Sequence, residues 1–162
     1  MKIGVLTGGG DCPGLNPAIR GGVLRALDFS DTVIGIQDGW AGLVNNITVP
    51  LRLEDVEEIL NRGGTILGTS RTNPFKKEAD YGPKVLENIK KLGFDGLGAV
   101  GGDDTLGVAR KLYEKHQIKT VGVPKTMDND LFATDFTFGF DTAVTVAVDA
   151  LGGGALDDAP QV

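Results

Sequence analysis

Two carboxylates follow a glycine pair in the segment VGGDDT at residues 100–105. The segment lies between an apolar run and a helical pattern, so it predicts a tight turn from a strand into a helix. The first N–H groups of a helix attract phosphate. Asp103 and Asp104 would oppose that phosphate unless a cation lay between them, so the turn favours a polyphosphate bridged by magnesium. Taken alone, the segment is equally compatible with an aspartate that caps an ordinary helix.

A second pair of carboxylates, Asp128 and Asp130, lies in the segment PKTMDND at residues 124–130. In an extended loop, side chains two residues apart point the same way. One carboxylate could therefore take a proton from a substrate hydroxyl while the other orients it or assists a metal. Phosphoryl transfer needs such positioning and charge neutralisation, and Lys125 and Thr126 stand beside the pair. An Asx turn is the alternative interpretation.

Two more polar loops have residues that suit phosphate. The segment GGGDCPGLN at residues 8–16 could bind it through glycine N–H groups, although it has neither the dinucleotide-binding nor the Walker spacing. A plain strand-to-helix turn would explain this loop as well. Arg71, in the segment SRTNP at residues 70–74, could make bidentate contact with phosphate oxygens. Its alternative is a solvated surface charge.

Alternating strand and helix patterns must position these loops. Apolar runs predict strands at residues 2–7, 32–36, 96–100 and 120–123, and helical spacing predicts helices at residues 16–27, 53–60, 82–92, 105–114 and 141–151. The alternation predicts an α/β fold, a three-layer sandwich with a mostly parallel, Rossmann-like sheet. The loops after Thr7, Val100 and Val123 all follow strand ends, so they should meet at the edge where open α/β sheets bind ligands.

Composition limits the classes of partner. The chain has 162 residues, the length of one domain, and a net charge of −6, which argues against nucleic acid or an anionic membrane. A phosphate ligand must then be held locally, by backbone N–H groups, a few cations and metal. The single cysteine, Cys12, fits a reducing cytoplasm, and no apolar run approaches the ~18 residues of a membrane span.

The final residues depart from the pattern. Three consecutive glycines at residues 152–154 should end the last helix near Leu151 and form a flexible joint, and the sequence ALDDAPQV that follows has no clear period. We therefore expect one domain over residues 1–151 and a Gly-rich joint and tail over residues 152–162.

Five segments together resemble the N-terminal half of the phosphofructokinase family in order and spacing. They are GGGDCPGLN at 8–16, ILGTSRTNP at 66–74, GGDDT at 101–105, PKTMDND at 124–130 and FGFDTAV at 138–144. The resemblance covers roughly residues 2–150. It implies the family's donor-side domain, a cytoplasmic enzyme of glycolysis, Mg²⁺ as cofactor, fructose 6-phosphate with pyrophosphate or ATP as substrates, and a homo-oligomer such as a homodimer.

Two positions look like the pyrophosphate-dependent branch of that family. In the ATP-dependent members, glycine usually occupies the positions of Asp104 and Lys125. Asp104 places bulk and negative charge where an α-phosphate would lie. Lys125 adds a cation that could hold pyrophosphate and stabilise charge on the leaving phosphate. The resemblance therefore implies a pyrophosphate:fructose-6-phosphate 1-phosphotransferase.

The resemblance also implies a role for each matching residue. The phosphoryl donor would be held by four residues, Gly10, Arg71, Gly102 and Thr105. Magnesium would be bound by Asp103. The sugar phosphate, or its metal-bound donor, would be held with the help of Thr126 and Asp130. Asp128 would be the general base for the sugar 1-hydroxyl, and Asp104 and Lys125 would complete the catalytic set and select the donor.

The chain also departs from the family. Family members are about twice as long, and their second half supplies most groups that grip the 6-phosphate of the sugar. The expectation is a donor and base half that is inactive alone, in a truncated, rearranged or engineered domain or a broken reading frame. Two other functions remain open: a phosphofructokinase-like module that binds phosphate without turnover, and an ATP-dependent kinase, either 6-phosphofructokinase or another sugar or lipid kinase.

Overall fold

The computed structural model describes residues 1–76 and 80–157, the last five of them by their backbone alone. Its elements in chain order are β1 (Lys2–Thr7), α1 (Leu15–Asp28), β2 (Thr32–Ile36), α2 (Trp40–Asn45), β3 (Thr48–Leu51), α3 (Leu53–Val56), α4 (Gly82–Leu92), β4 (Gly96–Gly101), α5 (Asp103–His116), β5 (Thr120–Pro124) and α6 (Phe140–Asp157).

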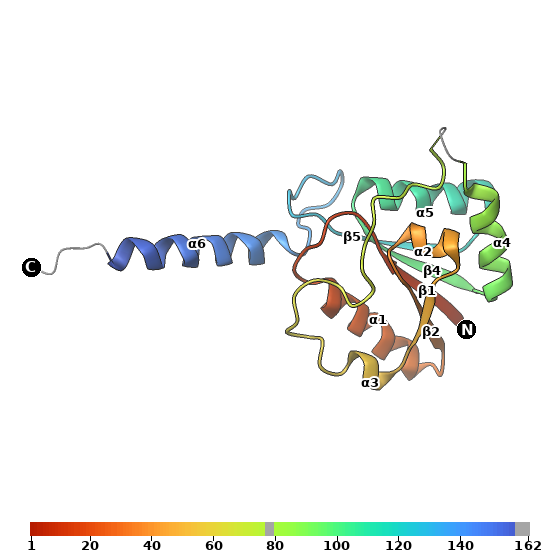
Figure 1. Ribbon diagram of the computed structural model, residues 1–162, viewed down its shortest axis with the longest axis horizontal. Helices are drawn as coiled ribbons and strands as arrows, with labels where there is room; N and C mark the ends of the chain where they lie inside the picture. Colours follow the sequence, from red (N-terminus) through yellow and green to blue (C-terminus); the bar gives the residue numbers. More distant parts are fainter. Residues whose placement is uncertain (77–79, 158–162) are drawn as a thin grey trace, which may run out of the picture.

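The strands form one mixed sheet in the order β3-β2-β1-β4-β5. The pairs β1–β2, β1–β4 and β4–β5 are parallel, and β3 runs antiparallel to β2 at one edge. Helices α1 and α3 lie on one face, and α2, α4 and α5 lie on the other (Figure 1). The predicted α/β sandwich with a mostly parallel sheet is therefore confirmed.

Each face of the sheet buries its own apolar core, because alternate strand residues point to opposite faces. Under α2, α4 and α5 the core contains Leu6, Ile36, Trp40, Val85, Ile89, Leu97, Val108 and Leu112. Under α1 and α3 it contains Ile19, Val23, Ala26, Val33, Leu51, Val56, Ile59 and Leu67.

The strand order creates a switch point between β1 and β4. The chain continues from β1 to β2 on one side and from β4 to β5 on the other. Loops that leave the carboxyl ends of β1 and β4 therefore diverge and leave a crevice, the usual ligand site of open α/β sheets. The three polar loops predicted to share this edge do share it, because β1, β4 and β5 are mutually parallel neighbours.

Two predictions about the segment between β2 and α4 were incomplete or wrong. The helix predicted for residues 53–60 ends at Val56, after four residues. Val56 and Ile59 are nevertheless both buried, because a short helix followed by a turn also brings residues three apart to the same core. Helix α2 and strand β3 were not predicted at all. β3 is an edge strand that contains Pro50, and proline weakens the sequence signal for a strand.

The two helices that follow strands β4 and β5 also have different bounds from those predicted. α5 starts at Asp103, two residues earlier than expected, so both aspartates belong to its first turn. α6 continues through the three glycines to Asp157, and the predicted helix end at Leu151 is wrong. Glycine lowers helix stability by about 1 kcal/mol per residue without preventing the backbone hydrogen bonds.

The division into a domain at residues 1–151 and a tail at residues 152–162 stays a prediction, and residues 158–162 lie outside the described part. Among the described residues, none of the helices combines the length and the apolar character needed to cross a membrane.

Asn16 connects α1 to the turn after α3 and gives a first testable prediction. Its buried side chain donates from Nδ2 to the Arg62 carbonyl at 2.9 Å and accepts at Oδ1 from the Ile66 N–H at 2.8 Å. Asn16→Ala should lower the free energy of unfolding by about 2–4 kcal/mol, because each buried group left unpaired costs ~1–3 kcal/mol. Urea denaturation measures this, with exposed Asn61→Ala as the control, for which we expect a change within about 0.5 kcal/mol. Equal midpoints for the two variants would contradict the prediction.

Candidate functional site

A cavity of about 300 Å³ lies at the carboxyl ends of β1, β4 and β5. Four separate segments line it, through residues Gly9, Gly10, Asp11, Arg71, Gly102, Lys125, Thr126, Met127 and Asp128. Six of these were expected from the sequence: Gly10, Arg71, Gly102, Lys125, Thr126 and Asp128. The fold thus gathers one guanidinium, one ammonium, two carboxylates and two glycine loops around one space.

Backbone hydrogen bonds fix the first glycine loop against its neighbours. The N–H of Gly8 donates to the Val100 carbonyl at 2.9 Å, and the N–H of Gly9 donates to the Ser70 carbonyl at 3.1 Å. The hydroxyl of Thr69 donates to the Gly9 carbonyl. Gly9 has a φ of +84°, which favours glycine. These bonds hold the loop that contains Arg71 beside the loop after β1.

Thr105 supports the cavity from beneath and does not line it. Its side chain is buried, and a Cβ at Gly8 or Gly101 would come within 2.5 or 2.6 Å of its hydroxyl oxygen. Glycine is therefore required at both positions because the threonine fills the space. Of the residues predicted to hold the donor, Thr105 alone is not brought to the cavity wall.

Lys125 places a positive charge at the cavity with little compensation. Only 4% of the residue is exposed, its Nζ donates to the Gly10 carbonyl, and its own N–H donates to the Gly101 carbonyl at 3.0 Å. None of the salt bridges in the described part of the chain includes Lys125. The Asp11 and Asp128 carboxylates line the same cavity, but neither forms a salt bridge with Lys125 in the described part of the chain. Because a buried ammonium without an ion-pair partner is costly, Lys125 favours an anion.

The loop after β5 separates its two aspartates. The Thr126 hydroxyl accepts from the Asp128 N–H at 3.0 Å and donates to Asp130 Oδ1 at 3.1 Å. Asn129, with a φ of +52°, accepts at Oδ1 from the Thr137 N–H at 3.0 Å and closes the loop. Asp130 is therefore engaged within the loop and does not line the cavity. The Asp128 carboxylate lines the cavity and makes no hydrogen bond to any described residue.

The start of α5 shows whether Asp103 or Asp104 caps the helix. The N-cap residue is Gly102, with extended backbone angles and no side-chain cap, so neither aspartate caps the helix. Asp103 and Asp104 are exposed in the first turn and do not line the cavity. No group of three or more potential metal ligands occurs among the described residues. Magnesium commonly uses one or two carboxylates plus substrate phosphates, so the exposed Asp103 carboxylate fits an ion that arrives with its ligand.

Cys12 packs between the first glycine loop and the start of α6. Its thiol is buried and donates to the Pro13 carbonyl at 3.1 Å and to the Phe138 carbonyl at 3.6 Å. Burial raises the pKa of the Cys12 thiol, and the nearby Lys125 ammonium acts in the opposite direction. The residue connects the first glycine loop to the base of α6.

Three residues that line the cavity were not named individually from the sequence: Gly9, which belongs to the first glycine loop, Asp11 and Met127. Asp11 could have been found as the carboxylate of the first glycine loop. Met127 has no chemical signal of this kind.

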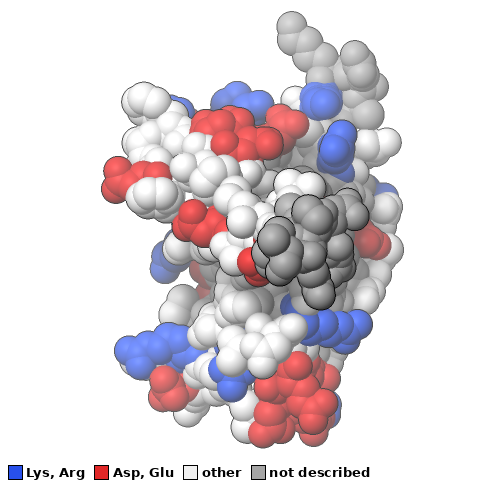
Figure 2. Space-filling view, turned by 90° about the vertical axis from the view of Figure 1, so that its left-hand side faces the viewer, with Lys and Arg blue, Asp and Glu red and all other residues white. Residues whose placement is uncertain are grey.

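On the side from which α6 projects, acidic and basic side chains are interspersed (Figure 2). This mixed surface agrees with phosphate being held by the few groups inside the cavity.

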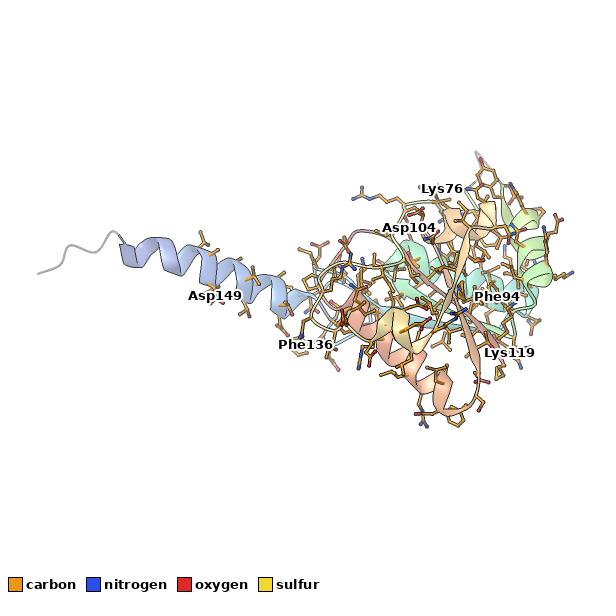
Figure 3. The ribbon with its side chains drawn as sticks, turned by 60° about the horizontal axis from the view of Figure 1, so that its bottom comes forward. Lys76, Phe94, Asp104, Lys119, Phe136 and Asp149 are labelled. Atoms are coloured by element: carbon orange, nitrogen blue, oxygen red, sulfur yellow. The ribbon has the colours of Figure 1, made fainter. Side chains whose placement is uncertain are left out.

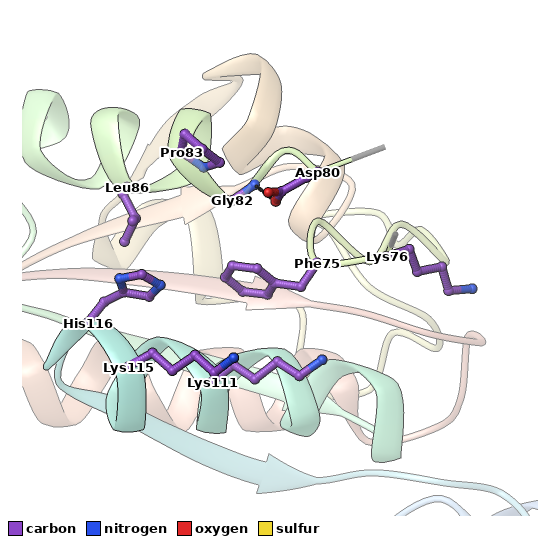
Figure 4. A pocket seen from close by; sticks show the side chains of 9 residues that line it. All are labelled: Phe75, Lys76, Asp80, Gly82, Pro83, Leu86, Lys111, Lys115 and His116. Atoms are coloured by element: carbon purple, nitrogen blue, oxygen red, sulfur yellow. Dashed lines mark hydrogen bonds between the residues drawn. The ribbon is translucent and has the colours of Figure 1, made fainter. Parts of the chain in front are cut away.

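A larger cavity, of about 500 Å³, lies between α4 and α5 (Figure 4). The rings of Phe75 and His116 stack there with centroids 6.3 Å apart, and Lys111 Nζ lies 6.0 Å from the Phe75 centroid. Asp80 accepts from the Gly82 N–H at 3.0 Å, at the start of α4. Lys111 lies eight residues after the first residue of α5, so it is about 12 Å along the helix from the end that borders the candidate site. None of the residues predicted from the sequence lines this cavity, so it is separate from the candidate site.

Comparisons with known proteins give a consistent result. The sequence model described as phosphofructokinase matches residues 2–153. The chain is 66% identical over 151 residues to a pyrophosphate–fructose 6-phosphate 1-phosphotransferase of Dictyoglomus thermophilum, covering 93% of this chain and 43% of that protein. It is 52% identical to ATP-dependent 6-phosphofructokinase 3 of Streptomyces coelicolor, covering 93% of this chain and 44% of that protein.

A solved structure agrees with these sequence matches. Phosphofructokinase of Pichia pastoris in the T-state superposes with a TM-score of 0.85 at 28% identity, covering 99% of this chain and 19% of that one. The chain thus spans less than half the length of the curated relatives it matches.

Proposed function

The chain belongs to the phosphofructokinase family, and we propose that it is the donor and base half of a pyrophosphate:fructose-6-phosphate 1-phosphotransferase. One observation carries this proposal. At the switch point of the sheet, a single cavity is lined by the Arg71 guanidinium, the buried Lys125 ammonium and the unengaged Asp128 carboxylate. Cations to hold phosphate and a base to deprotonate an alcohol are the two requirements of this reaction class.

We propose that pyrophosphate binds against the glycine loops. The backbones of Gly10 and Gly102 line the cavity, and the N-terminus of α5 contributes its positive dipole end. Arg71 and Lys125 would neutralise the phosphate oxygens. Magnesium held by Asp103 would supply further charge neutralisation when bound.

In the proposed reaction, Asp128 accepts the proton of the sugar 1-hydroxyl. The hydroxyl oxygen forms a bond to the terminal phosphorus as the bond from that phosphorus to the bridging oxygen breaks, and orthophosphate leaves. Lys125 stabilises the negative charge that develops on the leaving group. Thr126 and Asp130 are positioning residues, because their hydrogen bonds shape the loop that carries Asp128.

The choice of pyrophosphate over ATP depends on two side chains. Asp104 is exposed in the first turn of α5, where its negative charge opposes an additional phosphate. Lys125 fills the space beside Gly9 and Gly10, which glycine would leave open. The named activities of the relatives include both donors, and the relative with pyrophosphate is the more similar of the two compared.

A donor assay tests this proposal directly. The test protein joins this chain to the remaining length of the Dictyoglomus thermophilum relative. We expect kcat/KM with pyrophosphate to exceed that with ATP by at least ~100-fold, about 2.7 kcal/mol of differential transition-state binding. The double variant Asp104→Gly, Lys125→Gly should reduce this ratio at least tenfold. The matched control removes one acid and one base from the exposed face of α4, Glu87→Ala with Lys91→Ala. Comparable kcat/KM for the two donors in the unmodified protein would contradict the proposal.

A second candidate function is a phosphate-binding module without turnover, for which the cations and glycine loops of the same cavity would also serve. We also propose the cytoplasm as its location, supported by the single buried cysteine.

A further inference from the structure

Residues 137–139 directly precede α6 and contact two loops of the candidate site, the first glycine loop and the loop after β5. The backbone of Phe138 forms a parallel bridge with Lys125. On its other side, the Phe138 carbonyl accepts from the Cys12 thiol at 3.6 Å. Phe136 marks this place in Figure 3, where α6 joins the body of the molecule. The segment therefore connects two loops that line the same cavity.

Thr137, the first residue of this segment, makes hydrogen bonds on both sides of Asp128. Its hydroxyl donates to the Thr126 carbonyl at 2.7 Å, and its N–H donates to Asn129 Oδ1 at 3.0 Å. Only 3% of Thr137 is exposed, so water has little access to these bonds. The backbone before and after Asp128 is thus held by one residue that does not itself line the cavity.

The backbone of this loop decides where the Asp128 carboxylate lies. The carboxylate makes no hydrogen bond to any described residue, so no side-chain contact fixes it. The next residue, Asn129, has a φ of +52°, in the left-handed region that asparagine tolerates better than most residues. The chain therefore turns sharply directly after Asp128, and the bond from the Thr137 N–H holds that turn.

We propose that Thr137 is a further positioning residue for Asp128, and that residues 137–139 set the distance between this carboxylate and the first glycine loop. The proposal rests on the proposed function, in which Asp128 takes the proton of the acceptor hydroxyl and the glycine loop binds the donor. The rate of such a reaction depends on mutual placement, and a displacement of about 1 Å can lower it about 10²-fold. Valine matches the shape of threonine but lacks its hydroxyl, so Thr137→Val leaves the Thr126 carbonyl without its donor.

Kinetics of the joined protein used for the donor assay test the proposal. We expect Thr137→Val to lower kcat at least ~10-fold and to leave KM for pyrophosphate within about threefold, because Arg71 and Lys125 are unchanged. Thr137→Ser retains the hydroxyl and should keep kcat within about threefold of the unmodified protein. Thr120→Val is the matched control, because the Thr120 hydroxyl donates to the Ala109 carbonyl at 3.0 Å away from the cavity. Its kcat should stay within about twofold.

Amide hydrogen exchange of the 162-residue chain tests the same contact without turnover. The N–H groups of Asp128 and Thr137 are both hydrogen-bonded within this connection. Peptides that cover residues 126–138 should therefore exchange at least ~5-fold faster in Thr137→Val, and at the original rate in Thr137→Ser and Thr120→Val. Far-UV circular dichroism confirms that each variant is folded.

The outcomes separate this proposal from the proposed function. An unchanged kcat for Thr137→Val would overturn the positioning role, whether or not exchange becomes faster. An equal loss of kcat in Thr137→Ser or in Thr120→Val would also overturn it, because the effect would then not belong to this hydroxyl. Absence of turnover by the unmodified joined protein would contradict the proposed function. In that case exchange decides the role of Thr137, and equal exchange in Thr137→Val and the unmodified chain would show that this residue does not hold the loop.

Discussion

Asp128→Ser is expected to lower kcat by ~10²–10⁴-fold, the usual effect of removing a general base. The effect should be largely confined to kcat, with KM for fructose 6-phosphate within about threefold of its original value. The reason is the position of the carboxylate. It lines the cavity with the two cations and has no hydrogen-bond partner among the described residues, so it is available to accept a proton.

The measurement again uses the chain joined to the remaining length of the Dictyoglomus thermophilum relative, with kcat and KM determined at saturating pyrophosphate. Asp135→Ser is the matched control, because Asp135 is an exposed carboxylate in the same connection that does not line the cavity. We expect its kcat to stay within about twofold. A fall of less than threefold for Asp128→Ser would assign the base elsewhere, most directly to Asp130, which the Thr126 hydroxyl already holds in the same loop.

The convergence of the site was predictable from sequence because it follows from topology. Three polar loops were each placed after a strand, and parallel strands bring their carboxyl ends to one edge. The structure brings Gly10, Gly102 and Lys125 to one cavity for this reason. Arg71 reaches the same cavity from a loop that follows no strand, and the hydrogen bond from the Gly9 N–H to the Ser70 carbonyl holds that loop in place. No knowledge of side-chain packing was needed for that step.

Which residues of each loop line the cavity was not predictable in the same way. Thr105 looked like a ligand group because it is polar and follows a glycine turn, but it is buried beneath Gly8 and Gly101. Asp130 matched Asp128 in spacing and chemistry, and only the hydrogen bond from Thr126 distinguishes them. The first distinction depends on packing between segments distant in sequence and the second on the local geometry of one loop, and residue patterns encode neither.

The predicted bounds of helices and strands were wrong where the fold overrides a local preference of the sequence. The glycines at residues 152–154 predicted a helix end near Leu151, yet α6 continues to Asp157. Edge strand β3 was missed because it is only four residues long and contains Pro50. Neither error affected the site. The strands that form it are β1, β4 and the edge strand β5, and all three have clear apolar runs in the sequence.

The purified 162-residue chain should show no turnover of fructose 6-phosphate with either donor, while still binding pyrophosphate in the presence of magnesium. The cavity has the groups that suit a phosphoryl donor, whereas the chain spans less than half the length of its curated relatives. Without groups that hold the sugar against Asp128, the reaction loses its proximity contribution, which is worth up to ~7–11 kcal/mol. That loss exceeds the expected effect of any single substitution in the site.

Binding of pyrophosphate should be weak but specific to the start of α5. We expect a Kd no better than about 1 mM, equivalent to about −4 kcal/mol, because Asp103 and Asp104 oppose the anion until magnesium intervenes. Phosphorus NMR titration with and without magnesium measures this. Asp103→Ala should weaken the magnesium-dependent binding at least threefold, and Glu87→Ala on α4 should leave it unchanged. Binding that is independent of magnesium would contradict the assignment of Asp103. Steady turnover by the purified chain, with contaminating enzyme excluded, would contradict the prediction of inactivity and show that copies of this chain together rebuild a sugar site.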